Sequence, residues 1–240
     1  NMKIKEFLRA IADFAVPRTC LVCGRSLADK EGAEICLECC LNLPRTGMHP
    51  VATQSRGLNA VQERLADGPP LLYGAAWFYY SRNSPYATLI RTAKYYSRPD
   101  CGRSLGSMYA RELMADAPEI ARHIDVLLPV GMHWLKQLRR GYNQSREIAE
   151  GMGSVLGIAV GDNLTAVRGH ATQTRRTADE RRKNLIGIFA ISHPEEIRGL
   201  NVAVVDDVIT SGTTAAEAAR AVLDAGAATA SIFALGLTNS

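Results

Sequence analysis

Long apolar runs, the common nucleotide-binding loops and clustered histidines are all missing from this sequence. No stretch approaches 18 uninterrupted apolar residues, so we expect no membrane span. The absence of GxxxxGKS/T excludes a Walker-type phosphate loop, and the absence of GxSxG argues against a serine nucleophile elbow. The five histidines are scattered and indicate neither a catalytic triad nor a histidine metal site.

A strong excess of charge of one sign is also lacking. The 240 residues include 28 Lys and Arg against 24 Asp and Glu, which gives a formal net charge of +4. An excess of this size does not by itself indicate nucleic-acid binding, so the placement of the charges matters more than their sum. The length and the 47% hydrophobic content are typical of one α/β domain with one or two small appendages.

The N-terminal segment has the pattern of an amphipathic helix rather than that of a signal peptide. Between residues 3 and 15 the apolar side chains recur at helical spacing, and Glu6, Arg9 and Asp13 interrupt any continuous apolar run. With neither an export signal nor a membrane span, we expect a cytoplasmic protein.

The chain divides into three regions by composition. Residues 1–44 hold the N-terminal helix and most cysteines, residues 45–70 have little periodicity and are predicted to be a connector, and residues 71–240 form the main domain. In the main domain we expect strands at 71–80, 125–130, 202–205 and 229–235, and helices at 86–96, 144–156 and 213–225. Apolar strands between amphipathic helices predict an α/β fold with a parallel sheet covered on both faces.

Five of the six cysteines lie close together near the N-terminus, four of them in two CxxC pairs. Twelve residues separate Cys20 and Cys23 from Cys36 and Cys39, and this spacing lets four thiolates converge on a structural Zn²⁺ ion. Without an export signal, such clustering favours metal binding over disulfides. Cys40 is an alternative to Cys39 as the fourth ligand, and the sequence leaves this choice open.

The segment VAVVDDVITSGTT, residues 202–214, combines an apolar strand, two adjacent acids and a loop of small hydroxylated residues. We expect the strand to end at Asp206 and Asp207 and a helix to begin at about Thr213. Free backbone N–H groups and the positive end of a helix dipole favour phosphate, and carboxylates accept hydrogen bonds from vicinal hydroxyls. The segment therefore predicts a ribose 5-phosphate site, with the sugar on the two acids. The phosphate is expected on Thr210, Ser211, Gly212, Thr213 and Thr214.

This segment resembles the phosphoribosyl pyrophosphate (PRPP) signature of the type I phosphoribosyltransferases. The paired CxxC motifs, RRGYNQSREIA at 139–149, Thr172-Gln173 and RRKNLIGIF at 181–189 narrow the resemblance to ComF-type proteins. These are bacterial proteins of the phosphoribosyltransferase fold that are linked to DNA uptake in competent cells. The resemblance covers residues 15–237, is weakest over 45–70, and implies a type I phosphoribosyltransferase fold with a hood and a small N-terminal zinc module.

The resemblance also implies two loops that meet the pyrophosphate of PRPP. Pro129, Val130 and Gly131 correspond to the loop after the first core strand, and residues 168–183 correspond to a mobile loop that closes over the ligand. The guanidinium groups in the mobile loop are expected to bind phosphate oxygens bidentately. The loop carries Arg168, Arg175, Arg176, Arg181, Arg182 and Lys183, of which Arg175, Arg176 and Arg181 are the expected pyrophosphate contacts.

Four further residues are candidates for ligand contact. Lys94 stands where the family carries a lysine beside its hood, although a lysine on an amphipathic segment is commonly solvated. Arg140, Asn143 and Gln144 form a polar cluster at the start of a helix. Asn143 equally fits the N-cap of that helix.

By resemblance, the activity is the transfer of a phosphoribosyl group from PRPP in the presence of Mg²⁺. The protein must hold the ribose, neutralise the departing pyrophosphate and exclude water. We expect Asp206 and Asp207 to be the catalytic acids, holding ribose hydroxyls or Mg²⁺ through water. Thr210 stands where enzymes that salvage 6-oxopurines have an acid that serves the incoming base. The sequence therefore does not identify the acceptor, which is a nucleobase or another compound, and it leaves open whether the protein is catalytically active.

A second hypothesis comes from a different class of protein. The fold would serve as a scaffold or PRPP sensor in a competence factor that binds single-stranded DNA or the DNA-uptake machinery. The arginines of residues 168–183, together with Lys94, would hold the DNA. Aromatic residues for base stacking are few near these arginines, which weakens this alternative.

Overall fold

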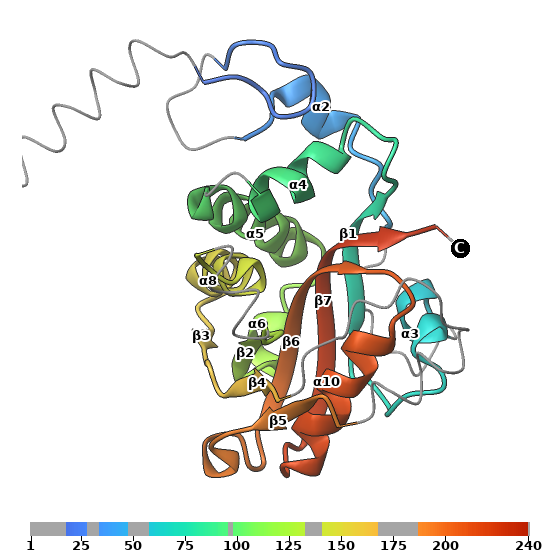
Figure 1. Cartoon of the computed structure of the whole chain (residues 1–240), viewed down its shortest axis with the longest axis vertical. Coiled ribbons are helices and arrows are strands. Elements are labelled where there is room, and N and C mark those ends of the chain that lie inside the picture. Colours follow the sequence, from blue (N-terminus) through green and yellow to red (C-terminus); the bar gives the residue numbers. More distant parts are fainter. Residues whose placement is uncertain are drawn as a thin grey trace, which may run out of the picture.

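The computed structural model describes residues 18–27, 34–47, 58–95, 98–132, 141–167 and 187–239. Its main body is an α/β fold whose five-stranded parallel sheet has the order β1-β7-β6-β2-β3 and carries helices on both faces (Figure 1). The sheet consists of β1 (Gly74–Tyr80), β2 (Val126–Pro129), β3 (Ala159–Val160), β6 (Asn201–Ile209) and β7 (Thr229–Thr238). A separate antiparallel pair is formed by β4 (Leu164–Ala166) and β5 (Phe189–Ile191).

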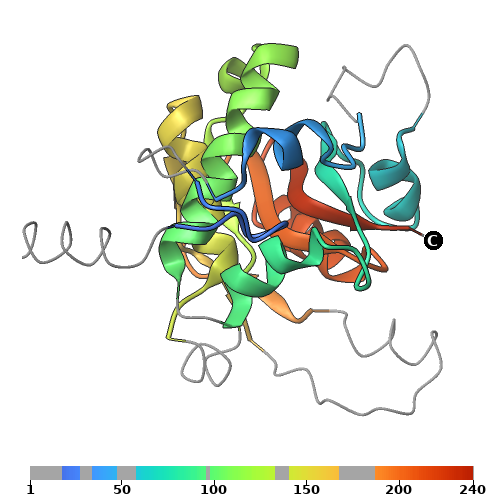
Figure 2. The ribbon, with the colours of Figure 1, turned by 90° about the horizontal axis from the view of Figure 1, so that it is seen from above.

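The helices fall into two layers and a small N-terminal module. The helices are α2 (Leu37–Leu41), α3 (Ala60–Arg64), α4 (Ala87–Tyr95), α5 (Pro99–Asp116), α6 (Ile120–His123), α8 (Gln144–Leu156), α10 (Thr213–Asp224) and the 3₁₀ turn η1 (Pro194–Glu196). Helices α4, α5 and α8 lie on one side of the sheet and α3 and α10 on the other (Figures 1 and 2). The module with α2 lies at one end, beside α4.

The central strand β6 is apolar without alternation because it is buried on both faces. Ala203 and Val205 pack in the core beneath α5 and α8, whereas Val202 and Val204 pack in the core beneath α10, and all four are fully buried. This is the pattern expected of a parallel sheet covered by helices. The predicted α/β fold, a parallel sheet covered by helices on both faces with a cysteine cluster near the N-terminus, is thus confirmed.

Helices α5 and α8 approach each other closely through glycine. A Cβ atom on Gly106 would lie 2.2 Å from the carbonyl oxygen of Ile148, and one on Gly151 would lie 2.0 Å from that of Arg103. Neither position therefore accepts a larger residue without moving a helix. This packing fixes the start of α8, which lies at the candidate site described below.

The expected helix over residues 144–156 matches α8, and the expected helix over 86–96 matches α4 within a residue at each end. The expected end of the strand at the acidic pair is wrong: β6 runs on to Ile209, because β7 continues to pair with it as far as Leu237. The eighteen-residue helix α5 is not among the elements expected from the sequence.

The stretch expected to be a connector contains structure. Pro44 accepts a hydrogen bond from the N–H of Tyr79 (2.8 Å), and the N–H of Thr46 donates to Trp77 (3.1 Å), so this segment runs antiparallel along the outer edge of β1. Helix α3 then begins at a capping box in which Asn59 and Gln62 exchange side-chain and backbone hydrogen bonds. Across the ranges that the structure describes, no helix has both the length and the apolar character to cross a bilayer.

Candidate functional site

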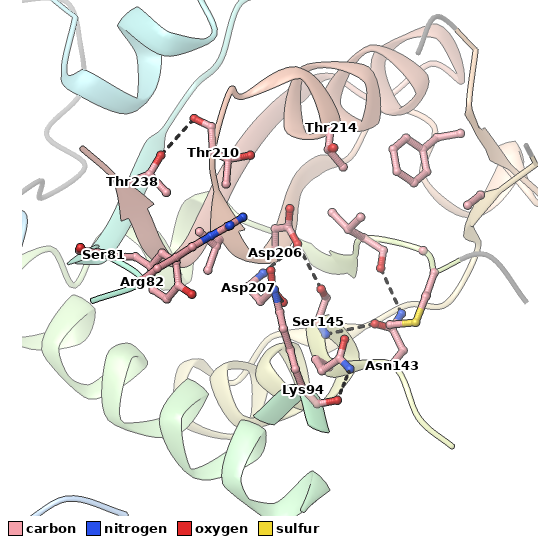
Figure 3. A pocket seen from close by; sticks show the side chains of 18 of the residues that line it. Ser81, Arg82, Lys94, Asn143, Ser145, Asp206, Asp207, Thr210, Thr214 and Thr238 are labelled. Carbon is pink, nitrogen blue, oxygen red and sulfur yellow. Dashed lines mark hydrogen bonds and ion pairs between the residues drawn. The ribbon is translucent and has the colours of Figure 1, made fainter. Parts of the chain in front are cut away.

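A cavity of about 650 Å³ opens at the carboxyl ends of the parallel strands (Figure 3). Its walls come from the ends of β1, β2, β6 and β7, from α4 and from the start of α8. Open α/β sheets bind ligands at this edge, because the loops after the strands gather there. The cavity is therefore the candidate site.

Asp206 and Asp207 lie in the cavity on a part of β6 that is paired on one side only. The pairing of β6 with β2 stops at Val205, opposite Pro129, whereas the pairing with β7 continues. The acids are thus held by a strand rather than by a loop. The end of β2 leaves room beside them for a ligand.

Asp206 is held by two hydrogen bonds. Its Oδ1 accepts from the hydroxyl of Ser145 (3.3 Å) and from the backbone N–H of Asp207 (2.8 Å). Burial, together with the neighbouring charge of Asp207, raises the pKa of Asp206 to about 7. Near neutral pH this carboxyl is therefore present in both protonation states and can donate as well as accept a hydrogen bond.

Asp207 forms an ion pair with Lys94. The Nζ atom of Lys94, in the last turn of α4, lies 2.7 Å from Oδ2 of Asp207, and both side chains are mostly buried. The backbone carbonyl of Lys94 in turn accepts a hydrogen bond from Nε2 of Gln144 (3.4 Å). Lys94 and Gln144, both predicted from the sequence, are therefore brought together in the cavity, with Lys94 paired rather than solvated.

The loop after β6 enters α10 through a left-handed glycine. Gly212 has φ of +78° and is the N-cap residue of α10. Thr210 and Thr214 line the cavity, whereas the hydroxyls of Ser211 and Thr213 lie 3.0 Å apart and hydrogen-bond each other. The first N–H groups of a helix have no partner within the helix, so this loop can present backbone donors to an anion.

The loop after β2 forms the opposite wall. Pro129 is the last residue of β2, and Val130 and Gly131 line the cavity. A Cβ atom on Gly131 would lie 2.4 Å from the carbonyl oxygen of Leu164, so glycine lets this wall pack directly on β4. Asn143 caps α8 by accepting from the N–H of Ser145 (3.1 Å), and its Nδ2 donates to the carbonyl of Val130 (3.1 Å).

Several cavity residues were not foreseen from the sequence. Arg82 points into the cavity from the loop after β1 (Figure 3), and no signal in the sequence marks it. Ser145 lies inside the segment RRGYNQSREIA that carries the family resemblance, which could have drawn attention to it. The predicted residues Arg140, Arg175, Arg176 and Arg181 lie outside the described residues.

The four cysteines of the two CxxC pairs meet in the N-terminal module. The sulfur atoms of Cys20, Cys23, Cys36 and Cys39 all lie within 4.8 Å of one another, and those of Cys23 and Cys36 are 3.7 Å apart. A tetrahedral site with Zn–S bonds of about 2.3 Å places its sulfur atoms about 3.8 Å apart. The arrangement can therefore hold a zinc ion.

The surroundings of Cys20 favour its thiolate form. Burial raises the pKa of Cys20, but hydrogen bonds from the backbone N–H groups of Cys23, Cys36 and Val22 outweigh it, and the pKa falls to about 6. The thiolate is the form of cysteine that binds metals.

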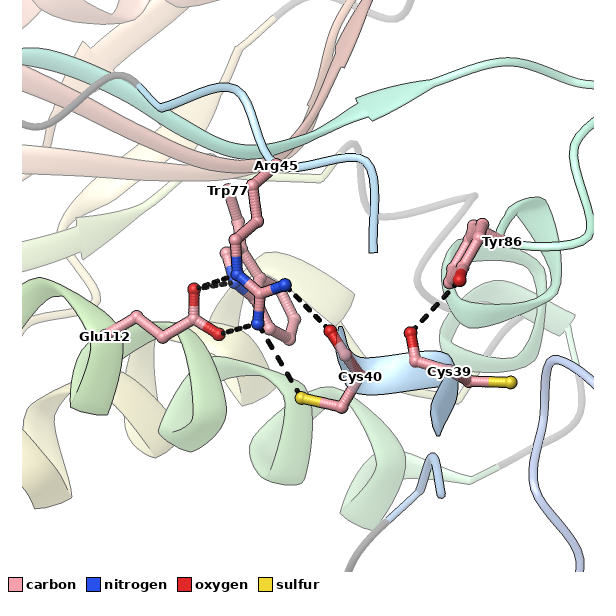
Figure 4. A network of polar contacts seen from close by, with 6 residues as sticks. All are labelled: Cys39, Cys40, Arg45, Trp77, Tyr86 and Glu112. Atoms are coloured by element: carbon pink, nitrogen blue, oxygen red, sulfur yellow. Dashed lines mark hydrogen bonds and ion pairs between the residues drawn. The ribbon is translucent and has the colours of Figure 1, made fainter. Parts of the chain in front are cut away.

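Cys40 is engaged elsewhere (Figure 4). Arg45 donates to the carbonyl of Cys40 (2.7 Å) and to its sulfur (3.7 Å), and it forms a bidentate pair with Glu112 at 2.8 and 2.7 Å. Glu112 also accepts from the indole N–H of Trp77 (2.9 Å). Of the two alternatives, the structure therefore groups Cys39, and not Cys40, with the other three cysteines. The network also ties the module to α5 and β1.

Comparisons with known proteins yield relatives along most of the chain. DNA utilization protein YhgH of Salmonella typhi is 32% identical over 157 residues, which cover 63% of this chain and 66% of the relative. The protein of the same name from Shigella flexneri is 27% identical over 221 residues, covering 90% and 88%. Competence protein F of Haemophilus influenzae is 34% identical over 98 residues, covering 40% and 43%. The first of these alignments thus spans just under two thirds of its relative. No protein-family model matches the chain.

Among solved structures, the glutamine PRPP amidotransferase of B. subtilis complexed with ADP and GMP is similar with a TM-score of 0.41 and 22% identity. The match covers 60% of this chain and 30% of that one.

Proposed function

We propose that this chain is a ComF-type protein, as its similarity to DNA utilization protein YhgH and competence protein F supports, and that it binds PRPP and Mg²⁺ and transfers the phosphoribosyl group. The observation that carries this proposal is the placement of Asp206 and Asp207 on the cavity floor, directly before a glycine-containing loop that enters α10. Acids beside a helix N-terminus suit a sugar that carries a phosphate.

In this proposal the ribose hydroxyls bind the two acids. The Asp206 carboxyl, with a pKa of about 7, can donate to one hydroxyl or accept from it. Asp207 keeps its position through the ion pair with Lys94. The 5-phosphate binds the backbone N–H groups and hydroxyls of residues 210–214, at the N-terminus of α10.

The donor atoms of the cavity fit Mg²⁺, because carboxylate oxygens and water are the ligands that this ion prefers. Asp206 and Asp207 would hold it through water, and when bound with PRPP it neutralises charge on the pyrophosphate. Transfer breaks the bond from C1 of the ribose to the pyrophosphate oxygen, which leaves with the electron pair, and an acceptor atom bonds to C1. Val130 and Gly131 would face the pyrophosphate, and Arg140, Arg175, Arg176 and Arg181 remain proposed contacts.

The N-terminal module has a structural role in this proposal. Residues 1–44 form a zinc module, residues 45–70 a connector and residues 71–240 the phosphoribosyltransferase domain of a cytoplasmic protein. The bond from the hydroxyl of Tyr86 to the carbonyl of Cys39 (3.1 Å) supports a structural role, because it ties the module to the start of α4.

A second candidate function follows from the names of the relatives, which refer to DNA utilization and competence. The chain would bind single-stranded DNA without catalysis. Arg82, which lines the cavity, favours this reading, and the guanidinium of Arg91 donates to the backbone carbonyl of Arg82 (2.6 Å), so a second basic residue lies beside it. Basic grooves of this kind follow the backbone of single strands.

Calorimetry with PRPP and Mg²⁺ tests the first proposal. The native protein should bind PRPP, and Asp206→Ala or Asp207→Ala should abolish binding. A panel of nucleobases then identifies an acceptor by the release of pyrophosphate. Absence of PRPP binding by the native protein would refute the proposal, whereas retardation of a single-stranded oligonucleotide with a steep salt dependence would support the second candidate.

A further inference from the structure

Arg64 lies behind the loop that follows β6 and contacts it through one nitrogen. Its Nη1 donates to the carbonyl of Thr210 (3.0 Å), to the carbonyl of Thr238 (2.6 Å) and to the hydroxyl of Thr238 (3.1 Å). These contacts join the end of α3 to the loop after β6 and to the end of β7. Arg64 itself lies within residues 45–70, which the sequence predicts to be a connector.

The backbone of α3 also packs on the same loop. A Cβ atom on Gly212 would lie 3.0 Å from the carbonyl oxygen of Arg64 and 3.1 Å from Cδ1 of Leu65. Helix α3 is itself fixed, because Asn59 forms its capping box and donates from Nδ2 to the carbonyl of Gly74 in β1 (2.7 Å). Arg64 therefore reaches the loop from an anchored position.

The hydrogen bond from Arg64 to the carbonyl of Thr210 determines the orientation of the peptide unit that joins Thr210 to Ser211. In a trans peptide the C=O and the following N–H point in opposite directions. With the carbonyl of Thr210 turned toward Arg64, the N–H of Ser211 points away from α3. A donor fixed in this way costs an anion less to bind than one that must first be ordered.

We propose that Arg64 is a positioning residue for the loop of residues 210–214, which it holds in the conformation that accepts the 5-phosphate of the ligand. This inference rests on the proposed function of the loop as the phosphate site. Arg64 acts through Thr210 and Thr238 and need not contact the ligand.

Calorimetry with two separate probes, ribose 5-phosphate and Mg²⁺-pyrophosphate, tests the inference. Arg64→Ala should weaken the binding of ribose 5-phosphate and of PRPP about tenfold, as expected for the loss of one charge-assisted contact. The binding of pyrophosphate should change less than twofold, because none of its proposed contacts lies on Arg64 or on residues 210–214. Arg64→Lys, which keeps the charge but not the planar donor group, should fall between Ala and the native protein.

Arg122→Ala is the matched control, because Arg122 is exposed on α6, at the amino end of β2 and away from the cavity. It should leave both affinities unchanged. If the native protein binds neither PRPP nor ribose 5-phosphate, the proposed function itself fails. If the native protein binds both and Arg64→Ala binds them equally well, or loses pyrophosphate to the same extent, the positioning role is refuted. Should Arg64→Ala fail to fold, Arg64→Lys gives the comparison: its affinity for ribose 5-phosphate should be reduced while its affinity for pyrophosphate is not, and an affinity for ribose 5-phosphate equal to that of the native protein would refute the positioning role.

Discussion

The Nζ atom of Lys94 lies 2.7 Å from Oδ2 of Asp207, so a cation carried by α4 neutralises an acid carried by β6. The pair joins the last turn of α4 to β6 at the cavity, and Tyr86, directly before α4, links the other end of this helix to Cys39 of the N-terminal module. Beside this pair, burial and the neighbouring charge of Asp207 raise the pKa of Asp206 to about 7.

Loss of the cation should destabilise the protein through Asp207. We expect Lys94→Met to lower the free energy of unfolding by about 1–2 kcal/mol, because a mostly buried carboxylate loses its partner. Urea unfolding at pH 7.5 measures this. The double variant Lys94→Met/Asp207→Asn should recover most of the loss, and strictly additive effects of the two substitutions would contradict the pairing.

The raised pKa of Asp206 predicts how stability depends on pH. The unfolded chain has an ordinary aspartate pKa of about 3.9, so the folded state binds more protons between that value and about 7. Stability is therefore lost as the pH rises through this window. In the absence of ligand, Asp206→Asn should have the higher melting temperature above pH 7, by several degrees, and the advantage should shrink toward pH 4.

Asp224→Asn is the control for this titration, because Asp224 is exposed at the end of α10. Its melting temperature should follow that of the native protein at every pH. An Asp206→Asn variant that runs parallel to the native protein from pH 4 to pH 8 would show that Asp206 does not titrate in this window.

Alanine substitutions at two glycines with left-handed backbone conformation distinguish a loss of stability from a loss of phosphate binding. Gly212 and Gly157 have φ of +78° and +71°, but only Gly212 lies in the proposed phosphate loop. Alanine at Gly157 should lower the free energy of unfolding by about 1–2 kcal/mol, the strain of a left-handed residue. Alanine at Gly212 should lower it by more, because its Cβ atom would also lie 3.0 Å from the carbonyl oxygen of Arg64. Gly212→Ala should in addition lose ribose 5-phosphate binding, measured by calorimetry, whereas Gly157→Ala should bind normally. Equal binding by both variants would argue against the loop as the phosphate site.

The cysteine cluster predicts the metal content. Elemental analysis should find one zinc ion per chain, and the double variant Cys20→Ser/Cys23→Ser should contain none. Cys39→Ser should lose the metal, and Cys40→Ser should retain it, because the Cys40 sulfur faces Arg45. A full equivalent of zinc in the double variant would rule out the site.

Local signals in the sequence were enough to predict the elements that form the site. Helix α8 has an apolar stripe between an asparagine cap and a terminal glycine, and β6 has an apolar run, so both could be located. Helix α5 was missed because Gly102 and Gly106 dilute its apolar pattern. The need for Gly106 becomes visible only when α8 lies against it.

The candidate site was predictable as a set of residues but not as an arrangement. The acids and the glycine loop form one continuous motif, and the structure places Lys94 of α4 and Gln144 of α8, both named from the sequence, on the wall of the same cavity. The ion pair of Lys94 with Asp207 depends on how α4 packs over the sheet. The role of Arg64 is likewise not visible in the sequence, because its hydrogen-bond partners, Thr210 and Thr238, lie far along the chain.

The short segment of Pro44 to Thr46 has a consequence for any shortened form of the protein. It covers the outer edge of β1, which is an edge strand of the sheet, through hydrogen bonds with Tyr79 and Trp77. Exposed strand edges pair readily with other chains. A fragment that begins after Thr46 would expose this edge of β1 to other chains, and we expect it to aggregate. The segment of Pro44 to Thr46, which follows the cysteine module, therefore protects the molecule from self-association.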